Sequence, residues 1–167
     1  MEPRFIIDTN VGKLAKWLRM MGYDAVLFGE IDDGRMVKQA LSQVRIIITK
    51  DSEFMKRRAV TTGRVKAILV CGDDPEIQMQ TVMQILQLDS EFKPFTRCLE
   101  CNIELMPRDR REVADTVPPR VYEIQEQYME CPSCHRIFWR GTHWQAMSMK
   151  LHQFGSIESQ LVEGGKL

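Results

Sequence analysis

The sequence has no excess of charge of either sign. Its 167 residues include 23 Lys and Arg against 23 Asp and Glu, and each half of the chain is nearly balanced as well. A neutral protein exerts no long-range attraction on nucleic acid or on a membrane surface. Any polyanion that binds this protein must therefore be held by a local patch of charge or by a metal ion.

Long hydrophobic runs are also lacking. No apolar stretch approaches the roughly 20 residues that are needed to cross a bilayer. The N-terminal segment MEPRFIIDTN does not have the layout of a signal peptide. We therefore expect a cytoplasmic protein that does not interact with membranes. In a reducing compartment, cysteines arranged as CxxC pairs favour metal binding over disulfide formation.

Short apolar runs and helical patterns alternate over the N-terminal half of the chain. The runs that predict buried strands are 4–7, 23–28, 45–49 and 65–70. Apolar residues spaced as on one helix face, or capping residues, predict helices over 14–21, 35–42, 52–60 and 75–88. Buried strands without a polar face that alternate with helices are typical of a doubly wound, parallel α/β sheet.

Two of the predicted strands end at an aspartate. Asp8 follows the first strand and Asp51 follows the third. Ligands of open α/β sheets bind beyond the carboxyl ends of the strands, near the point where the strand order reverses. The two acids are therefore expected at one edge of the sheet.

The amino-acid composition changes after Leu88. Pro, Arg and Cys become frequent there, and the apolar residues no longer follow a helical or strand period. We predict an α/β domain over residues 1–93 and a small second domain over residues 94–154. The polar, glycine-containing segment 155–167 is expected to be a flexible tail.

The strongest local pattern is a set of four cysteines in two pairs. They are Cys98, Cys101, Cys131 and Cys134. Four thiolates in two CxxC pairs are typical of a structural zinc site, which leaves no coordination position open for a substrate. A helix or hairpin within PPRVYEIQEQY is expected to fill the long loop between the pairs. The alternatives are reduced, unligated pairs or a redox dithiol.

Acids are the second pattern. Asp8, Asp51 and one of the pair Asp32 and Asp33 could gather around Mg²⁺ or Mn²⁺, because hard divalent ions prefer carboxylate oxygen. Each acid also has a purely structural interpretation, since an aspartate after a strand caps a helix or binds turn amides. Asp73 and Asp74 are further candidates that also fit an ordinary turn.

Basic and aromatic residues form the third pattern. Lys13, Lys16 and Arg19 fall on the first predicted helix, directly after Asp8, where they could meet phosphates. The aromatic residues of FWRGTHW (138–144) could stack on bases, although such residues more often pack the small core of a zinc module.

Five segments together resemble the Mut-seven C-terminal RNase domain family, over residues 4 to about 152. They are FIIDTNVGKLAKWLRMMGYDAVLF, DDGRMVKQA, RIIITKD, RCLECN and CPSCHRIFWRGTHW. The resemblance implies a PIN-like nuclease domain with an appended zinc ribbon. It implies a metal-dependent ribonuclease, expected to be an endonuclease that acts on single-stranded RNA.

Carried over residue by residue, the resemblance assigns roles to positions of this chain. Asp8, Asp33 and Asp51 match the catalytic acids that would hold Mg²⁺ or Mn²⁺, with Asp32 as a less favoured middle acid. Lys13 and Arg19 match the basic positions that contact nucleic acid. Cys98, Cys101, Cys131 and Cys134 match the zinc ligands of the ribbon.

The sequence departs from the PIN pattern in one respect, because no glutamate lies between Met36 and Ser42 in the second predicted helix. This departure favours an alternative, a catalytically inactive module that binds RNA or protein. A third interpretation is a phosphoacceptor domain, since Asp51 follows a third parallel strand. Such domains need an acid pair after the first strand, where this chain supplies one acid.

Overall fold

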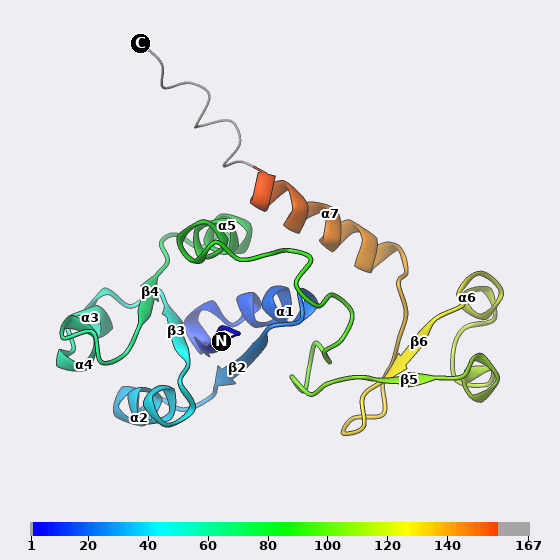
Figure 1. Ribbon diagram of the computed structural model, residues 1–167, viewed down its shortest axis with the longest axis horizontal. Coiled ribbons are helices and arrows are strands. Elements are labelled where there is room, and N and C mark those ends of the chain that lie inside the picture. The colour runs from blue at the N-terminus through cyan, green and yellow to red at the C-terminus, as the bar shows by residue number, and fades with distance from the viewer. Residues whose placement is uncertain (1, 157–167) are drawn as a thin grey trace, which may run out of the picture.

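The computed structural model of the protein describes residues 2–156 (Figure 1). Residues 157–167, which form most of the predicted flexible tail, lie outside the described part of the chain. Gly155 and Ser156, which the sequence assigns to that tail, belong instead to the last helix.

A parallel sheet organises the N-terminal part of the chain. Its strands are β1 (Arg4–Asp8), β2 (Asp24–Phe28), β3 (Ile46–Thr49) and β4 (Ala67–Leu69). The order in the sheet is β2-β1-β3-β4, and every neighbouring pair is parallel. The strand order therefore reverses beside β1, which places its carboxyl end where open α/β sheets bind ligands.

Helices cover both faces of this sheet (Figure 1). On one face lie α1 (Lys13–Met20) and α5 (Pro75–Leu86), and on the other lie α2 (Asp33–Gln43), α3 (Ser52–Met55) and α4 (Arg58–Thr61). Phe5 and Ile7 pack towards α1 and α5, whereas Ile6 packs towards α2, and all three are fully buried. The prediction of a parallel α/β sheet is confirmed.

The prediction of one helix over 52–60 is wrong. Two single-turn helices occupy this stretch, because Arg57 has an extended backbone (φ −62°, ψ 138°) and starts α4 as its N-cap.

A second, antiparallel sheet carries the cysteine segment. It consists of β5 (Met106–Arg108), β6 (Tyr128–Glu130) and β7 (Ile137–Phe138) in sequence order. Between β5 and β6 lie the 3-10 helix η2 (Arg110–Val113) and the helix α6 (Pro119–Ile124). The helix expected in PPRVYEIQEQY is therefore present.

The last helix, α7 (Thr142–Ser156), leaves the second sheet and returns to pack against α5 and α1 (Figure 1). Its Leu151 is buried in the core of the α/β part, and Met147 and Phe154 pack beside it. The sequence analysis predicts no helix over Thr142–Ser156. Division of the chain at residues 93 and 154 stays a prediction, and α7 joins the second segment to the first.

Among the described residues, none of the helices is long and apolar enough to cross a membrane.

Candidate active site and metal centre

Asp8 ends β1 and is partly buried at the carboxyl edge of the sheet. Its Oδ2 atom accepts two hydrogen bonds, from Thr49 Oγ1 at 2.7 Å and from Asn10 Nδ2 at 2.7 Å. Thr49 ends the neighbouring strand β3 and is fully buried. Two protein donors therefore fix the orientation of the Asp8 carboxylate.

The same threonine connects Asp8 to Asp51. Besides donating to Asp8, Thr49 Oγ1 accepts a hydrogen bond from the backbone N–H of Asp51 at 3.0 Å. The Asp51 carboxylate caps α3 by accepting from the N–H of Glu53 at 2.8 Å. The structure thus brings Asp8 and Asp51 to one edge of the sheet, on neighbouring strand ends.

Asp32 and Asp33 have different roles at the start of α2. Asp32 is the N-cap, and its Oδ1 accepts from the N–H of Gly34 at 2.8 Å. Asp33 is the first helical residue, and its Oδ2 accepts from Arg57 Nη2 at 2.7 Å. Asp33 is therefore engaged in an ion pair with the chain that precedes α4.

The three predicted acids do not form one tight cluster. Over residues 2–156, the only group of three or more His, Cys, Asp or Glu ligand atoms within 4.8 Å of one another is the cysteine set. Asp73 is exposed and accepts from Lys50 Nζ at 2.8 Å, a hydrogen bond that lowers its pKa. Asp74 caps α5.

Lys13 lies at the start of α1, exposed, and it forms no ion pair with any residue that the structure describes. Its side chain lines a hollow of about 360 Å³ together with Thr9 and Asn10, which follow Asp8 in the chain. This position places a positive charge next to the loop that carries the acid.

Arg19 does not occupy the surface position that the resemblance implied. Its side chain is buried, and burial lowers the pKa of its guanidinium. Arg19 Nε donates to the carbonyl of Ala25 at 2.9 Å, and Nη1 donates to the carbonyls of Leu99 and Glu100 at 2.7 and 3.0 Å. The guanidinium therefore ties α1 to β2 and to the first CxxC loop, and it is not available to phosphate.

The four predicted zinc ligands meet in space. The Sγ atoms of Cys98, Cys101, Cys131 and Cys134 all lie within 4.8 Å of one another. The Sγ atoms of Cys98 and Cys134 are 3.8 Å apart. Four sulfurs held tetrahedrally at about 2.3 Å from a zinc ion are separated by about 3.8 Å. The cluster can therefore hold a zinc ion.

Both CxxC loops have the same backbone geometry. Asn102 and His135, each the residue after the second cysteine of its pair, have left-handed φ angles of 62° and 57°. Their N–H groups donate to the carbonyls of Cys98 and Cys131, at 3.0 and 2.9 Å. The repeated geometry turns each pair of thiols towards one point.

Burial and backbone hydrogen bonds shift the pKa values of Cys98 and Cys131 in opposite directions. Burial raises the pKa of the Cys98 thiol to about 12. Burial also opposes ionisation of Cys131, but hydrogen bonds from the N–H groups of Cys134 and Ser133 lower its pKa to about 7. A zinc ion would bind all four sulfurs as thiolates, and its charge would offset the cost of ionising the buried Cys98 thiol.

Comparison with known families adds an independent observation. The Mut7-C RNAse domain matches residues 3–151. This chain belongs to that family. Membership in the Mut7-C RNAse domain family suggests a ribonuclease-like function and RNA as the bound polymer. No curated protein and no solved structure matches the chain.

Two residues of this Mut7-C domain site were not identified from the sequence. Thr49 and Asn10 each lie two positions from an acid, in the segments T-x-D and D-x-N. Small polar side chains so close to an acid at a strand end are a usable signal, because they can bond that acid or its backbone. Their importance appears only when β1 and β3 are placed side by side.

Proposed function

We propose that this protein is a metal-dependent ribonuclease whose Mg²⁺ or Mn²⁺ site is built around Asp8 and Asp51, with Asp33 as the third acid. The observation that carries the proposal is the Thr49 hydroxyl, which bonds both the carboxylate of Asp8 and the backbone of Asp51. Membership in the Mut7-C RNAse domain family supports the same reading.

The donor set suits a hard divalent ion. Asp8 and Asp51 offer carboxylate oxygens, and Mg²⁺ is commonly bound by one or two carboxylates together with water and substrate phosphate. Two acids at the sheet edge therefore suffice, and Asp33 would join them by leaving its partner Arg57. When bound, such an ion lowers the pKa of water and neutralises charge on the phosphate.

The surrounding residues of the chain position the acid and the substrate. Thr49 and Asn10 hold Asp8 Oδ2, so that the carboxylate needs no reorganisation on binding. Lys13 lies beside the same loop, has no ion-pair partner among residues 2–156, and would attract a phosphate of the RNA backbone.

Cleavage of single-stranded RNA by the purified protein in Mn²⁺ tests the proposal. We expect cleavage by the wild type and a loss of at least about 100-fold in Asp8→Asn, because the substitution removes a charged oxygen ligand. Asp115→Asn is the matched control, since Asp115 is an exposed acid of the second segment, and it is expected to cleave normally. Equal cleavage by the wild type and Asp8→Asn would assign the activity to another site or a contaminant.

The endonuclease part of the proposal has a separate readout. A covalently closed circular RNA has no end for an exonuclease to use. An endonuclease converts it to a linear product, and we expect this product with the wild type in Mn²⁺. Cleavage of linear RNA alone would identify an exonuclease and leave the metal site in place.

A catalytically inactive RNA- or protein-binding module is the second candidate. The ion pair between Asp33 and Arg57 favours it, because that pair neutralises the third acid. RNA that is retained in EDTA without turnover in any divalent metal would support this candidate. Turnover that EDTA abolishes would exclude it.

A further inference from the structure

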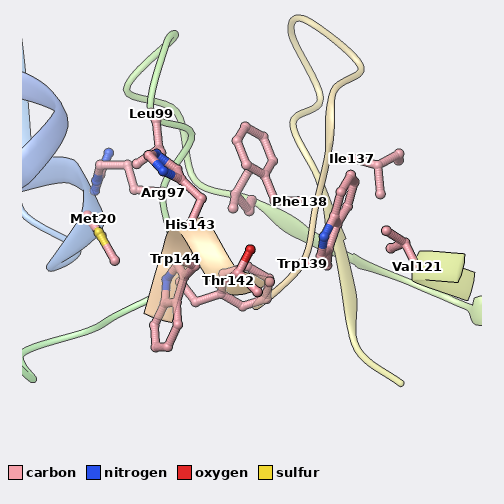
Figure 2. A pocket seen from close by; sticks show the side chains of 13 residues that line it. Met20, Arg97, Leu99, Val121, Ile137, Phe138, Trp139, Thr142, His143 and Trp144 are labelled. Atoms are coloured by element: carbon pink, nitrogen blue, oxygen red, sulfur yellow. The ribbon is translucent and has the colours of Figure 1, made fainter. Parts of the chain in front are cut away.

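A pocket of about 430 Å³ lies where the antiparallel sheet, α1 and α7 meet, away from the acids. Figure 2 shows Met20 of α1 on one side of it and Trp139 of the ribbon on the other, with Thr142 and Trp144 between them. Phe95 and Phe138 complete an aromatic lining, and no acidic residue contributes to it. The pocket is therefore mostly apolar and aromatic, with Arg97 and His143 as basic side chains in its lining and no acid.

A cationic group lies against two of these rings, although it is not one of the residues that line the pocket. The Arg140 guanidinium lies over two rings, 5.2 Å from the centroid of Phe95 and 4.9 Å from that of Trp144. Arg140 forms no ion pair with any residue between 2 and 156. Aromatic rings beside a cationic group suit a ligand with a π face, as a nucleobase has.

A basic hollow continues from the aromatic pocket along α1. It lies between α1 and α7, and it is lined by Lys13, Lys16 and Lys150 beside Trp17. His143 lines both this hollow and the aromatic pocket. The two spaces are therefore adjacent, with one side chain exposed to both.

The basic hollow in turn adjoins the acids. Lys13 and Gly12 line it and also line the hollow beside Thr9 and Asn10, the residues that follow Asp8. Because α1 has eight residues and rises about 1.5 Å per residue, Lys13 and Met20 at its ends are separated by roughly 10 Å. One path therefore leads from Asp8 along α1 to the aromatic pocket.

Lysines line this path from the acids to the aromatic pocket. No acid lines the aromatic pocket or the basic hollow, although Lys16 pairs with Glu100 and Lys150 with Glu76 from outside them, and Asp73 lines the hollow beside Thr9 and Asn10. Lys13, which forms no ion pair within residues 2–156, is the cation of the path that is available to a phosphate. Lysines followed by an aromatic pocket match a backbone phosphate followed by an unstacked base.

Building on the proposed function, we propose that the aromatic pocket binds one unstacked base of single-stranded RNA while the lysines of α1 and α7 hold the intervening backbone. Trp139 and Trp144 line the pocket and contact the base. The pocket thereby sets which nucleotide lies at Asp8, a fixed distance from the bound base.

The test is a set of RNA oligonucleotides in which one nucleotide at a time is made abasic. Affinity is measured by fluorescence anisotropy with Asp8→Asn, which prevents cleavage during the measurement. We expect about a tenfold loss of affinity at one or two adjacent abasic positions and little change elsewhere, because stacking acts on a single base. Equal losses at every position would overturn the proposal.

Thr142 provides a matched pair of variants. Its side chain is exposed, lines the pocket and forms no hydrogen bond within residues 2–156, so Thr142→Phe fills the pocket and Thr142→Val keeps its volume. In the Asp8→Asn background we expect Thr142→Phe to weaken intact RNA about tenfold and to abolish the position dependence. Thr142→Val should retain both, and unchanged binding by Thr142→Phe would overturn the proposal.

A further variant covers the case in which Thr142→Phe does not fold, as judged by its thermal unfolding. Lys13→Gln is expected to weaken all oligonucleotides equally and to reduce the salt dependence by about one phosphate contact, while the abasic pattern persists. Loss of the pattern in Lys13→Gln would contradict a separate base pocket. Position-dependent binding without cleavage by the wild type would refute the nuclease alone, and cleavage without position dependence would refute the pocket alone.

Discussion

Thr49 links Asp8 and Asp51 through hydrogen bonds of its side chain. Its hydroxyl donates its one hydrogen to Asp8 and uses a lone pair to accept from the Asp51 backbone. Because the side chain is fully buried, water does not compete for these bonds. Thr49 therefore fixes the position of the Asp8 carboxylate relative to the backbone of Asp51. The proposed reaction requires both acids.

Individual residues show which parts of the candidate site can be predicted from the sequence and which cannot. Asp8 and Asp51 could be placed at one edge because parallel strands align their carboxyl ends, and the cysteines because CxxC spacing dictates a turn. Arg19 could not be placed, because its burial depends on Leu99 and Glu100, some eighty residues away. The spacing of apolar residues along α1 cannot predict that a loop distant in the sequence will cover Arg19.

Asp24 provides a pH-dependent prediction at this scale. Its carboxylate accepts from Arg45 at 2.8 and 2.9 Å and from Asn102 at 2.7 Å. Burial opposes ionisation, but the hydrogen bonds from Arg45, Asn102 and Arg4 hold the pKa of Asp24 well below its usual range. We expect Asp24→Asn to lower the free energy of unfolding by about 3 kcal/mol at pH 7, because it leaves a buried Arg45 unpaired.

The direction with pH follows from the lowered pKa. Stabilisation by Asp24 is fully present above its unfolded pKa of about 3.9 and declines as the pH falls below that value. Urea unfolding of both proteins between pH 7 and pH 3 should therefore show their difference shrinking in the acid range. Comparing the two at each pH cancels loss of zinc, which affects both, and a difference that grows towards pH 3 would contradict the assignment.

At the scale of elements, the central strands β1 and β3 were predictable because they are buried on both faces and therefore read as continuous apolar runs. The helix α7 is absent from the sequence-based prediction, although the residues that it packs on the core, the buried Leu151 and the partly buried Trp144, Met147 and Phe154, are spaced 3, 4 and 3 apart. That spacing is a helical signal. The same aromatic residues after the second CxxC pair also suit the core of a zinc module, so the sequence alone leaves their role ambiguous.

The turn between α1 and β2 depends on a glycine. Gly22 has a φ of 92°, and a Cβ there would lie 2.2 Å from the carbonyl oxygen of Lys93. We expect Gly22→Ala to destabilise the protein by about 3 kcal/mol, since backbone strain and a backbone clash add. The readout is the urea midpoint.

Gly63 is the matched control for this prediction. Its φ is also positive, at 70°, but no atom lies within 4 Å of a Cβ at that position. Gly63→Ala should therefore cost only about 1 kcal/mol, the conformational penalty alone. Equal losses of stability in Gly22→Ala and Gly63→Ala would show that the close approach of the Lys93 carbonyl to Gly22 does not contribute to the cost.

At the scale of the whole molecule, several contacts join the cysteine-bearing segment and α7 to the α/β part. Arg19 reaches the first CxxC loop, Asn102 of that loop reaches Asp24 and Ala25 of β2, and α7 packs on α1 and α5. The cysteine cluster therefore supports more than its own small sheet. Removal of zinc is expected to affect the edge of the large sheet as well.

This expectation can be measured in two steps. Native mass spectrometry should find one zinc ion per chain in the wild type and none in Cys131→Ser. On removal of zinc, the amide of Ala25 should exchange faster with solvent, because its acceptor is the Asn102 Oδ1 atom at 2.9 Å. The amide of Ile47, bonded within the α/β part to the carbonyl of Lys66, serves as the control. Unchanged exchange at Ala25 would mean that the first CxxC loop stays docked without its ion.

Location of Mn²⁺ in a crystal by anomalous scattering tests the central claim most directly, because it does not depend on choosing the right RNA. Carboxylate oxygens of both Asp8 and Asp51 are expected at about 2 Å from the ion. In Asp8→Asn crystals the peak should disappear. Manganese bound elsewhere, for instance at Asp73 and Asp74, with Asp8 still held only by Thr49 and Asn10, would contradict the proposed nuclease site.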